Sequence, residues 1–143
     1  YYDRRFENAM EEAKKGIECL DKKSFYRRAK NWKFGKDDIG LYTTLGDCAR
    51  LLEQYDKALE AYNYVVSHSN YTYTDVYYDR GRCKYYLGDI DGALKDFQKH
   101  QEIIEKYLYD QSITEYKDLY PRYDQKDLNR VREWIKTCYS DKF

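Results

Sequence analysis

The feature that most constrains the fold is an internal repeat with a period of 35 residues. Residues 42–62 read YTTLGDCARLLEQYDKALEAY, and residues 77–97 read YYDRGRCKYYLGDIDGALKDF. The aligned identities and near-identities are Tyr42 and Tyr77, Gly46 and Gly81, Cys48 and Cys83, Ala58 and Ala93, Leu59 and Leu94, and Tyr62 and Phe97. A fixed period of about 20 to 50 residues is typical of arrays of stacked structural units.

Length and composition set broad limits on the class of protein. The 143 residues suffice for one domain with a sizeable core, and 26 basic residues balance 26 acidic ones. No net charge therefore attracts the chain to nucleic acid or to an anionic membrane. No apolar run approaches the roughly 18 residues of a membrane span. Because the chain starts at Tyr1, we expect a processed or trimmed product. Its compartment stays open, with a weak preference for the cytoplasm.

The four cysteines, at positions 19, 48, 83 and 138, show neither close-paired metal spacing nor a C-x-x-C redox pair. Cys48 and Cys83 occupy the same repeat position, next to small residues, so we interpret both as small buried hydrophobic residues. A disulfide or a regulatory thiol remains the alternative. Cysteine usage weakly favours a reducing compartment.

Apolar residues recur at three- and four-residue steps along most of the chain, which predicts an all-α fold. Strand signals are absent apart from a brief alternation at residues 71–78, where the repeat register favours a helix start. Asp37 or Asp38 is a candidate N-cap, and a stripe of Leu128, Val131, Ile135 and Cys138 is predicted to be buried. The predicted helices span residues 2–20, 24–33, 39–52, 55–68, 73–87, 90–107 and 125–139.

The connections between the repeat helices are short, so consecutive helices should pack antiparallel. Beyond residue 107 the repeat fades; Ser112 and Glu115 have capping-box spacing, and Pro121 ends that segment. We therefore expect a single helical domain of residues 1–143. Its parts would be a divergent helical unit at 1–36, repeats at 39–72 and 74–107, and a C-terminal capping segment at 108–143.

The spacing of aromatic, Leu-Gly, alanine and aromatic residues resembles the tetratricopeptide repeat (TPR), a pair of helices in a unit of about 34 residues. The first repeat carries Leu45-Gly46 and the second carries Arg80-Gly81, so the second departs from the pattern at the leucine position. The second-aromatic position holds Ala49 and Lys84, and Asn70 replaces the closing proline. The resemblance implies an α-solenoid in which glycine and alanine mark close helix contacts.

The resemblance also implies a binding module, in which the first helix of each pair lines a groove for a peptide or a partner helix. When the family's repeat alignment is applied to this sequence, Gly40, Leu51 and Asp75 are also at groove positions. Tyr85 or Tyr86 could equally pack between helices, and Asp47 with Arg82 indicates a mixed-charge surface. The Lys and Asn set by which some family members hold a C-terminal carboxylate is missing. The candidate groove residues are Thr43, Asp47, Arg50, Tyr78, Arg82, Tyr85 and Tyr86.

A second candidate surface is the segment KKSFYRRAKNWKFGK, residues 22–36, which has seven basic residues and no acidic one. Its basic side chains, interleaved with aromatic rings, are suited to single-stranded nucleic acid. We rank three interpretations of this segment. The first is a solvated face that attracts the acidic middle of its own or a neighbouring chain, the second is a site for an acidic protein partner, and the third is a site for nucleic acid. Association between copies of the chain therefore stays open. The basic residues are Lys22, Lys23, Arg27, Arg28, Lys30, Lys33 and Lys36.

Nothing in the sequence indicates an enzyme. The two histidines, His68 and His100, lack a readable nucleophile or acid partner, and no glycine-rich phosphate loop is present. Asp89 and Asp91 resemble helix caps and turn residues, and His100 is placed to face the following helix. We therefore expect a non-catalytic interaction module or scaffold without a metal or other cofactor, whose partner is a protein or peptide.

Overall fold

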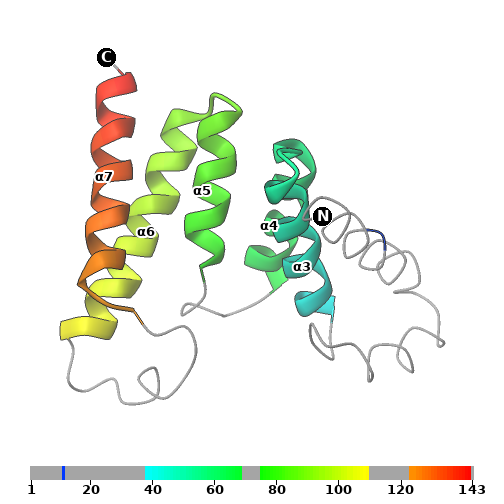
Figure 1. The fold of residues 1–143 in the computed structure, drawn as a ribbon, viewed down its shortest axis with the longest axis horizontal. Coiled ribbons are helices and arrows are strands. Elements are labelled where there is room, and N and C mark those ends of the chain that lie inside the picture. Colours follow the sequence, from blue (N-terminus) through cyan, green and yellow to red (C-terminus); the bar gives the residue numbers. More distant parts are fainter. Residues whose placement is uncertain (1–10, 12–37, 69–74, 110–122, 143) are drawn as a thin grey trace. The chain divides into compact units, whose positions relative to one another are not determined.

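The structure is a computed structural model that describes residues 11, 38–68, 75–109 and 123–142. Within these ranges every regular element is an α-helix and no strand occurs, which confirms the all-α prediction for them (Figure 1). The elements are α3 (Asp38–Leu51), α4 (Tyr55–His68), α5 (Val76–Tyr86), α6 (Ile90–Tyr109) and α7 (Gln125–Lys142).

The observed bounds lie within three residues of the predicted ones, and the largest changes are at the end of α7, which runs to Lys142 rather than to residue 139, and at the start of α5. This helix begins at Val76 rather than at residue 73, and Asp75 forms the turn before it. The described part of the alternating segment, residues 75–78, is turn and helix, so the helical interpretation is confirmed there. The helices predicted at 2–20 and 24–33, the turn at 69–72 and the capping box at Ser112 lie outside the described residues.

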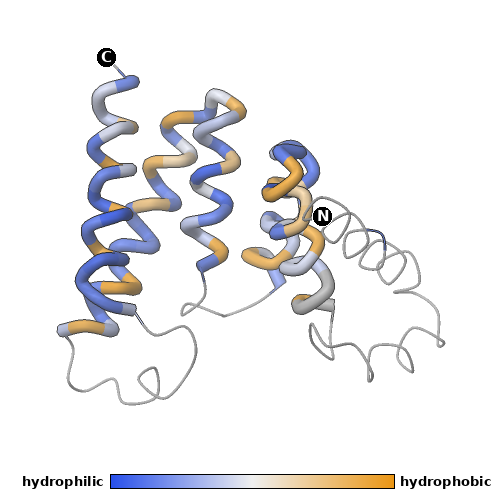
Figure 2. Tube along the Cα trace, viewed as in Figure 1, coloured by the Kyte–Doolittle hydropathy of each residue, from blue (hydrophilic) through white to orange (hydrophobic). Residues whose placement is uncertain are grey.

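The chain divides between Ser69 and Asn70 into two compact units. In the first unit, α3 packs against α4. In the second unit, α6 packs against α5 and also against α7, so that α6 lies at the centre of the contacts (Figure 1). Along α4, α6 and α7, hydrophobic residues recur among hydrophilic ones, as expected for amphipathic helices (Figure 2).

The α3–α4 and α5–α6 hairpins close with the same turn. In the first, the N–H groups of Glu53 and Gln54 donate to the carbonyls of Arg50 and Ala49. The bonds from Gly88 to Tyr85 and from Asp89 to Lys84 repeat this pattern 35 residues later. The central residue is left-handed in both turns, with φ of 61° at Glu53 and 91° at Gly88. The sequence repeat is therefore a repeat of backbone structure within each hairpin.

Each hairpin also brings an aromatic ring against a glycine. A Cβ atom on Gly46 would lie 2.5 Å from the ring of Tyr62, and one on Gly81 would lie 2.9 Å from the ring of Phe97. Both rings are fully buried, as are Ala58 and Ala93 on the same helices. The prediction that small residues mark the helix contacts is confirmed, because a larger side chain at either glycine would displace the ring.

The core of the second unit joins α6 to α7. The buried residues Leu128, Val131 and Cys138 of α7 pack with Phe97 and Ile104 of α6, whereas Ile135 is only half-buried. Among the described cysteines, Cys48, Cys83 and Cys138 are free and buried. Their assignment as small hydrophobic residues is therefore confirmed, while Cys19 lies outside the described residues.

Side-chain caps begin two helices of the second unit. The Asp89 carboxylate accepts the N–H of Gly92 at 3.0 Å, at the start of α6. Before α7, Asp124 and Asp127 each accept the other's backbone N–H, and these bonds hold the pKa of Asp124 below its usual range. The cap role predicted for Asp89 is confirmed.

Candidate binding surface on α5 and α7

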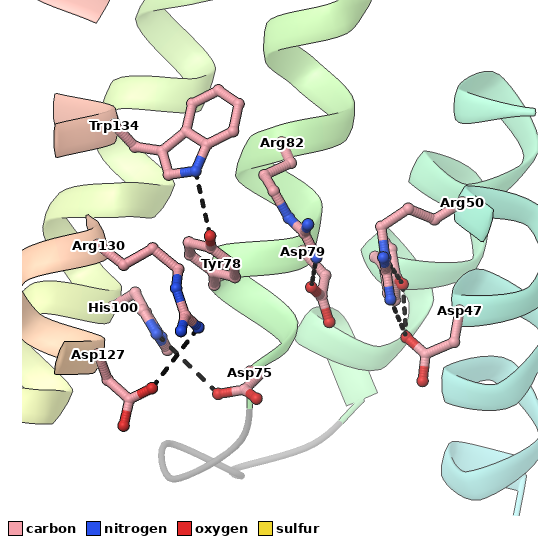
Figure 3. A network of polar contacts seen from close by, with 11 residues as sticks. Asp47, Arg50, Asp75, Tyr78, Asp79, Arg82, His100, Asp127, Arg130 and Trp134 are labelled. Carbon is pink, nitrogen blue, oxygen red and sulfur yellow. Dashed lines mark hydrogen bonds and ion pairs between the residues drawn. The ribbon is translucent and has the colours of Figure 1, made fainter. Parts of the chain in front are cut away.

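Tyr78 connects all three helices of the second unit (Figure 3). Its hydroxyl accepts the indole N–H of Trp134 on α7 at 3.1 Å. Its half-buried ring contacts Phe97 and His100 of α6, with ring centroids 5.9 and 5.2 Å away. Tyr78 therefore anchors α5 to its neighbours, and the surface available to a partner lies on the side chains around it.

Arg82 lies one turn beyond Tyr78 and covers its ring. The guanidinium carbon is 4.6 Å from the Tyr78 ring centroid, and Nη2 donates to Asp79 at 2.6 Å (Figure 3). Arg82 Nε is buried without a hydrogen-bond partner among the described residues. The Arg82 side chain remains 27% exposed, so the cation is oriented by a ring and a carboxylate while part of it faces solvent.

Tyr85 and Tyr86 complete the α5 part of the surface at the end of the helix. Both rings contact Trp134, and the Tyr85 hydroxyl donates to Asp141 near the end of α7. Tyr86 is 54% exposed, whereas Tyr85 is half-buried. Of the four predicted residues on α5, Tyr78 and Tyr85 bond to α7, and Tyr86 is the most exposed.

A partly buried polar cluster lies at the other end of α5, near the start of α7. Asp75 does not cap α5; its carboxylate accepts the Tyr123 hydroxyl and lies 4.0 Å from His100 Nε2 (Figure 3). Partial burial raises the pKa of Asp75, as does the nearby charge of Asp79. Burial also raises the pKa of Tyr123. The cluster thus joins two buried groups, His100 and Tyr123, to a carboxylate whose side chain is 50% exposed.

His100 is the most buried titratable group in that cluster. Its side chain is 5% exposed, and Nδ1 has no hydrogen-bond partner among the described residues. Burial, with repulsion from Arg130, lowers the pKa of His100 to about 4, so the imidazole is neutral at pH 7. The prediction that His100 faces the following helix is supported by its edge contact with Tyr123, two residues before α7.

In the first unit, the predicted groove residues gather around the hydroxyl of Tyr62. This hydroxyl donates to Asp47 Oδ1 at 2.6 Å and accepts from Arg50 Nε at 3.2 Å. Asp47 and Arg50 therefore hold the buried ring in place as well as reaching solvent. Thr43 donates to the carbonyl of Ile39 within its own helix. The seven basic residues predicted at 22–36 lie outside the described residues.

Several residues of the α5–α7 surface escaped the sequence reasoning. Trp134 lies beside the predicted stripe, three residues after Val131, and helical spacing alone could have placed it there. Asp141 and Tyr123 have no sequence signal, because no repeat relates α7 to α5. Among the described residues, no group of three metal-ligating side chains occurs, and none of the described helices is long and apolar enough to cross a membrane. The surface can act by aromatic contact, hydrogen bonding and ion pairing.

Comparison with known proteins supplies no identification: no family model, curated protein or solved structure matches the chain.

Proposed function

We propose that the chain is a TPR-like helical-repeat domain that binds a peptide or helix of a partner protein. The observation that carries this proposal is the repeated hairpin. The turn bonds at Glu53 and Gly88 and the glycine–aromatic contacts at Gly46 and Gly81 recur with the 35-residue period. Repeats of this kind usually act by presenting a surface to a partner, because each unit uses its conserved geometry for packing and leaves other positions free to vary.

In the second unit, the proposed contact surface is the exposed part of α5 together with Trp134. Arg82 and Tyr86 are the side chains that a partner would meet first, because the Tyr86 side chain is largely exposed and part of the Arg82 guanidinium faces solvent. Tyrosine and arginine often dominate binding energy, because they combine a large contact area with a polar end. Asp79 and Asp75 lie on the same helix end, so the surface carries both signs of charge and suits a polar or amphipathic peptide.

A random-peptide phage library panned against the full chain tests this proposal. Selected peptides are synthesised and titrated by calorimetry against the wild type, Arg82→Gln, Tyr86→Ala and Tyr109→Ala. Tyr109 is a matched control, because it is 60% exposed and lies at the end of α6, where its hydroxyl donates to Gln125 at the start of α7. We expect Arg82→Gln and Tyr86→Ala to weaken binding by roughly thirty-fold, the effect of losing about 2 kcal/mol at a hot spot.

Helicity measured by circular dichroism should be the same in all four proteins, since the substituted side chains are partly or largely exposed. Peptides that bind Arg82→Gln and Tyr86→Ala as tightly as the wild type would contradict the assignment of this surface. Failure of the library to yield any saturable peptide would contradict peptide binding itself.

A further inference from the structure

Three aromatic rings meet nearly at right angles between the end of α5 and the middle of α7. The ring planes of Tyr85 and Tyr86 are 81° apart, those of Tyr85 and Trp134 are 76° apart, and those of Tyr86 and Trp134 are 86° apart. The corresponding centroid distances are 5.6, 5.2 and 6.1 Å. Three mutually perpendicular planes at contact distance make a corner, and we call these three residues the aromatic corner.

Two of its walls are held by bonds to the rest of the unit. The Trp134 indole stacks on Phe97 at a centroid distance of 5.2 Å and donates its N–H to Tyr78 (Figure 3). The Tyr85 hydroxyl is fixed by its hydrogen bond to Asp141. The third wall, Tyr86, is 54% exposed, so its ring is accessible to a ligand. A site with two fixed walls loses little conformational entropy on binding.

The charges around the aromatic corner favour a cation. Aromatic faces attract positive charge, and the Asp141 carboxylate beside Tyr85 has acceptor capacity at both of its oxygens. The nearby cations are engaged elsewhere: Arg82 pairs with Asp79 at 2.6 Å, and Lys142 pairs with Asp91 at 3.0 Å. A guanidinium suits this combination better than an ammonium, because its planar group stacks on rings and bonds a carboxylate with two N–H groups at once.

We infer that the aromatic corner binds an arginine side chain of a partner, with Asp141 as its counter-charge. The inference deepens the proposed function, on which it rests for the source of the arginine, and it names the residue type that a bound peptide must supply. Exposed Tyr86 covers one face of the guanidinium, Trp134 lies against its edge, and Asp141 accepts its N–H groups.

The test uses the full chain and three capped peptides, acetyl-Gly-Ser-Arg-Ser-Gly-amide and the same peptide with citrulline or with lysine in place of arginine. Citrulline has nearly the shape of arginine but no charge. Binding is followed by NMR through the indole N–H signal of Trp134, and the signal of Trp32, the chain's second tryptophan, serves as a reference. We expect a saturable shift of the Trp134 signal with the arginine peptide, and binding roughly five-fold weaker with the citrulline peptide.

Four variants separate the aromatic contribution from a general attraction of charge. Tyr86→Ala should weaken binding of the arginine peptide about five-fold, and Tyr86→Phe should retain it because the ring face remains. Tyr109→Ala, at an exposed tyrosine of α6, should bind as the wild type does. Asp141→Asn should reduce the preference for arginine over citrulline.

Equal binding of the citrulline and arginine peptides, or unchanged binding in Tyr86→Ala, would overturn the inference. A lysine peptide that binds as tightly as the arginine peptide would overturn the choice of arginine. The two proposals can fail separately. If the arginine peptide binds but the phage library yields no saturable peptide, the inference about the aromatic corner stands and the proposed peptide-binding function does not. Library peptides that lack arginine and leave the Trp134 signal unchanged would support the peptide-binding function and remove the aromatic corner as its arginine site.

Discussion

The carboxylate of Asp96 is buried against the guanidinium of Arg80. Arg80 Nε donates to Oδ2 at 2.8 Å, Nη2 donates to Oδ1 at 2.6 Å, and Lys84 Nζ lies 3.2 Å from Oδ2. The Asp96 side chain is 4% exposed, and the two cationic side chains are 15% and 17% exposed. Counting back 35 residues, the equivalent positions hold Leu45, Ala49 and Ala61. The second hairpin therefore uses three charged residues where the first uses three apolar ones.

This difference predicts how the charged triad responds to substitution. Asp96→Ala leaves two mostly buried cations without their carboxylate and should lower the free energy of unfolding by about 3–5 kcal/mol. The triple variant Arg80→Leu, Lys84→Ala, Asp96→Ala copies the first hairpin and should recover most or all of that loss, because no uncompensated buried charge remains. Urea denaturation measures both effects. A triple variant no more stable than Asp96→Ala would show that the apolar residues of the first hairpin do not fit the second hairpin.

The shared hairpin turn predicts opposite effects at two equivalent positions. Glu53 has φ of 61° where its counterpart Gly88 has φ of 91°, and a side chain in this left-handed region is strained. Glu53→Gly should therefore stabilise the chain by about 0.5–1 kcal/mol, and Gly88→Glu should destabilise it by about 1 kcal/mol. Thermal melts of the two variants provide the comparison, and each serves as a control for the other. A Glu53→Gly variant that melts below the wild type would contradict the account of strain.

The contact between Gly81 and Phe97 predicts a loss of stability when a methyl group is added. A Cβ on Gly81 would also lie 3.2 Å from Asp96 Cβ, so the helices must separate or the ring must move. Gly81→Ala should cost about 1–3 kcal/mol, the usual cost of overpacking. Adding Phe97→Leu should make the Gly81→Ala change less costly, since the smaller side chain frees space. Additive effects in this double-mutant cycle would mean that the two residues do not share the strain.

The lowered pKa of His100 predicts a loss of stability in mild acid. The pKa of a histidine in an unfolded chain is about 6.5, and the folded-state pKa of His100 is about 4. On acidification the unfolded state therefore binds the proton at a higher pH than the folded state. The contribution of neutral His100 to the free energy of unfolding is fully present above about pH 6.5 and is lost as the pH falls towards 4. Its size is about 3 kcal/mol from the difference between the two pKa values.

The raised pKa of Asp75 works in the opposite direction, because its protonation on acidification favours the folded state. The two contributions are separated by comparing the wild type with His100→Gln, which keeps the polar side chain but does not titrate. The free-energy difference between these proteins should change between pH 7 and 4, with the wild type losing more stability. A difference that is constant with pH would show that His100 is not buried as a neutral imidazole.

Local pattern predicted the elements and the contacts inside each hairpin. Helical spacing gave bounds close to those observed, and the repeat identified Gly46 and Gly81 as helix-contact points. The structure shows that the rings of Tyr62 and Phe97 are what these glycines contact. These features are readable because a short turn forces two neighbouring helices together, so the partners are close in sequence. The candidate groove residues were assigned from their positions in the repeat, but those positions could not show that Tyr78 and Tyr85 would be bonded to α7.

The amino-acid sequence alone determined that residues 38–68 and 75–109 form helical hairpins, since the spacing of apolar and small residues encodes which helix face is buried. Tertiary structure decided which side chains meet on the candidate binding surface. Trp134 meets Tyr78, and Asp141 meets Tyr85, across 56 residues of chain, and Tyr123 reaches Asp75 from before α7. No period relates these residues to one another, and only the packing of α7 on α6 brings their hydrogen-bonding groups and rings within contact distance.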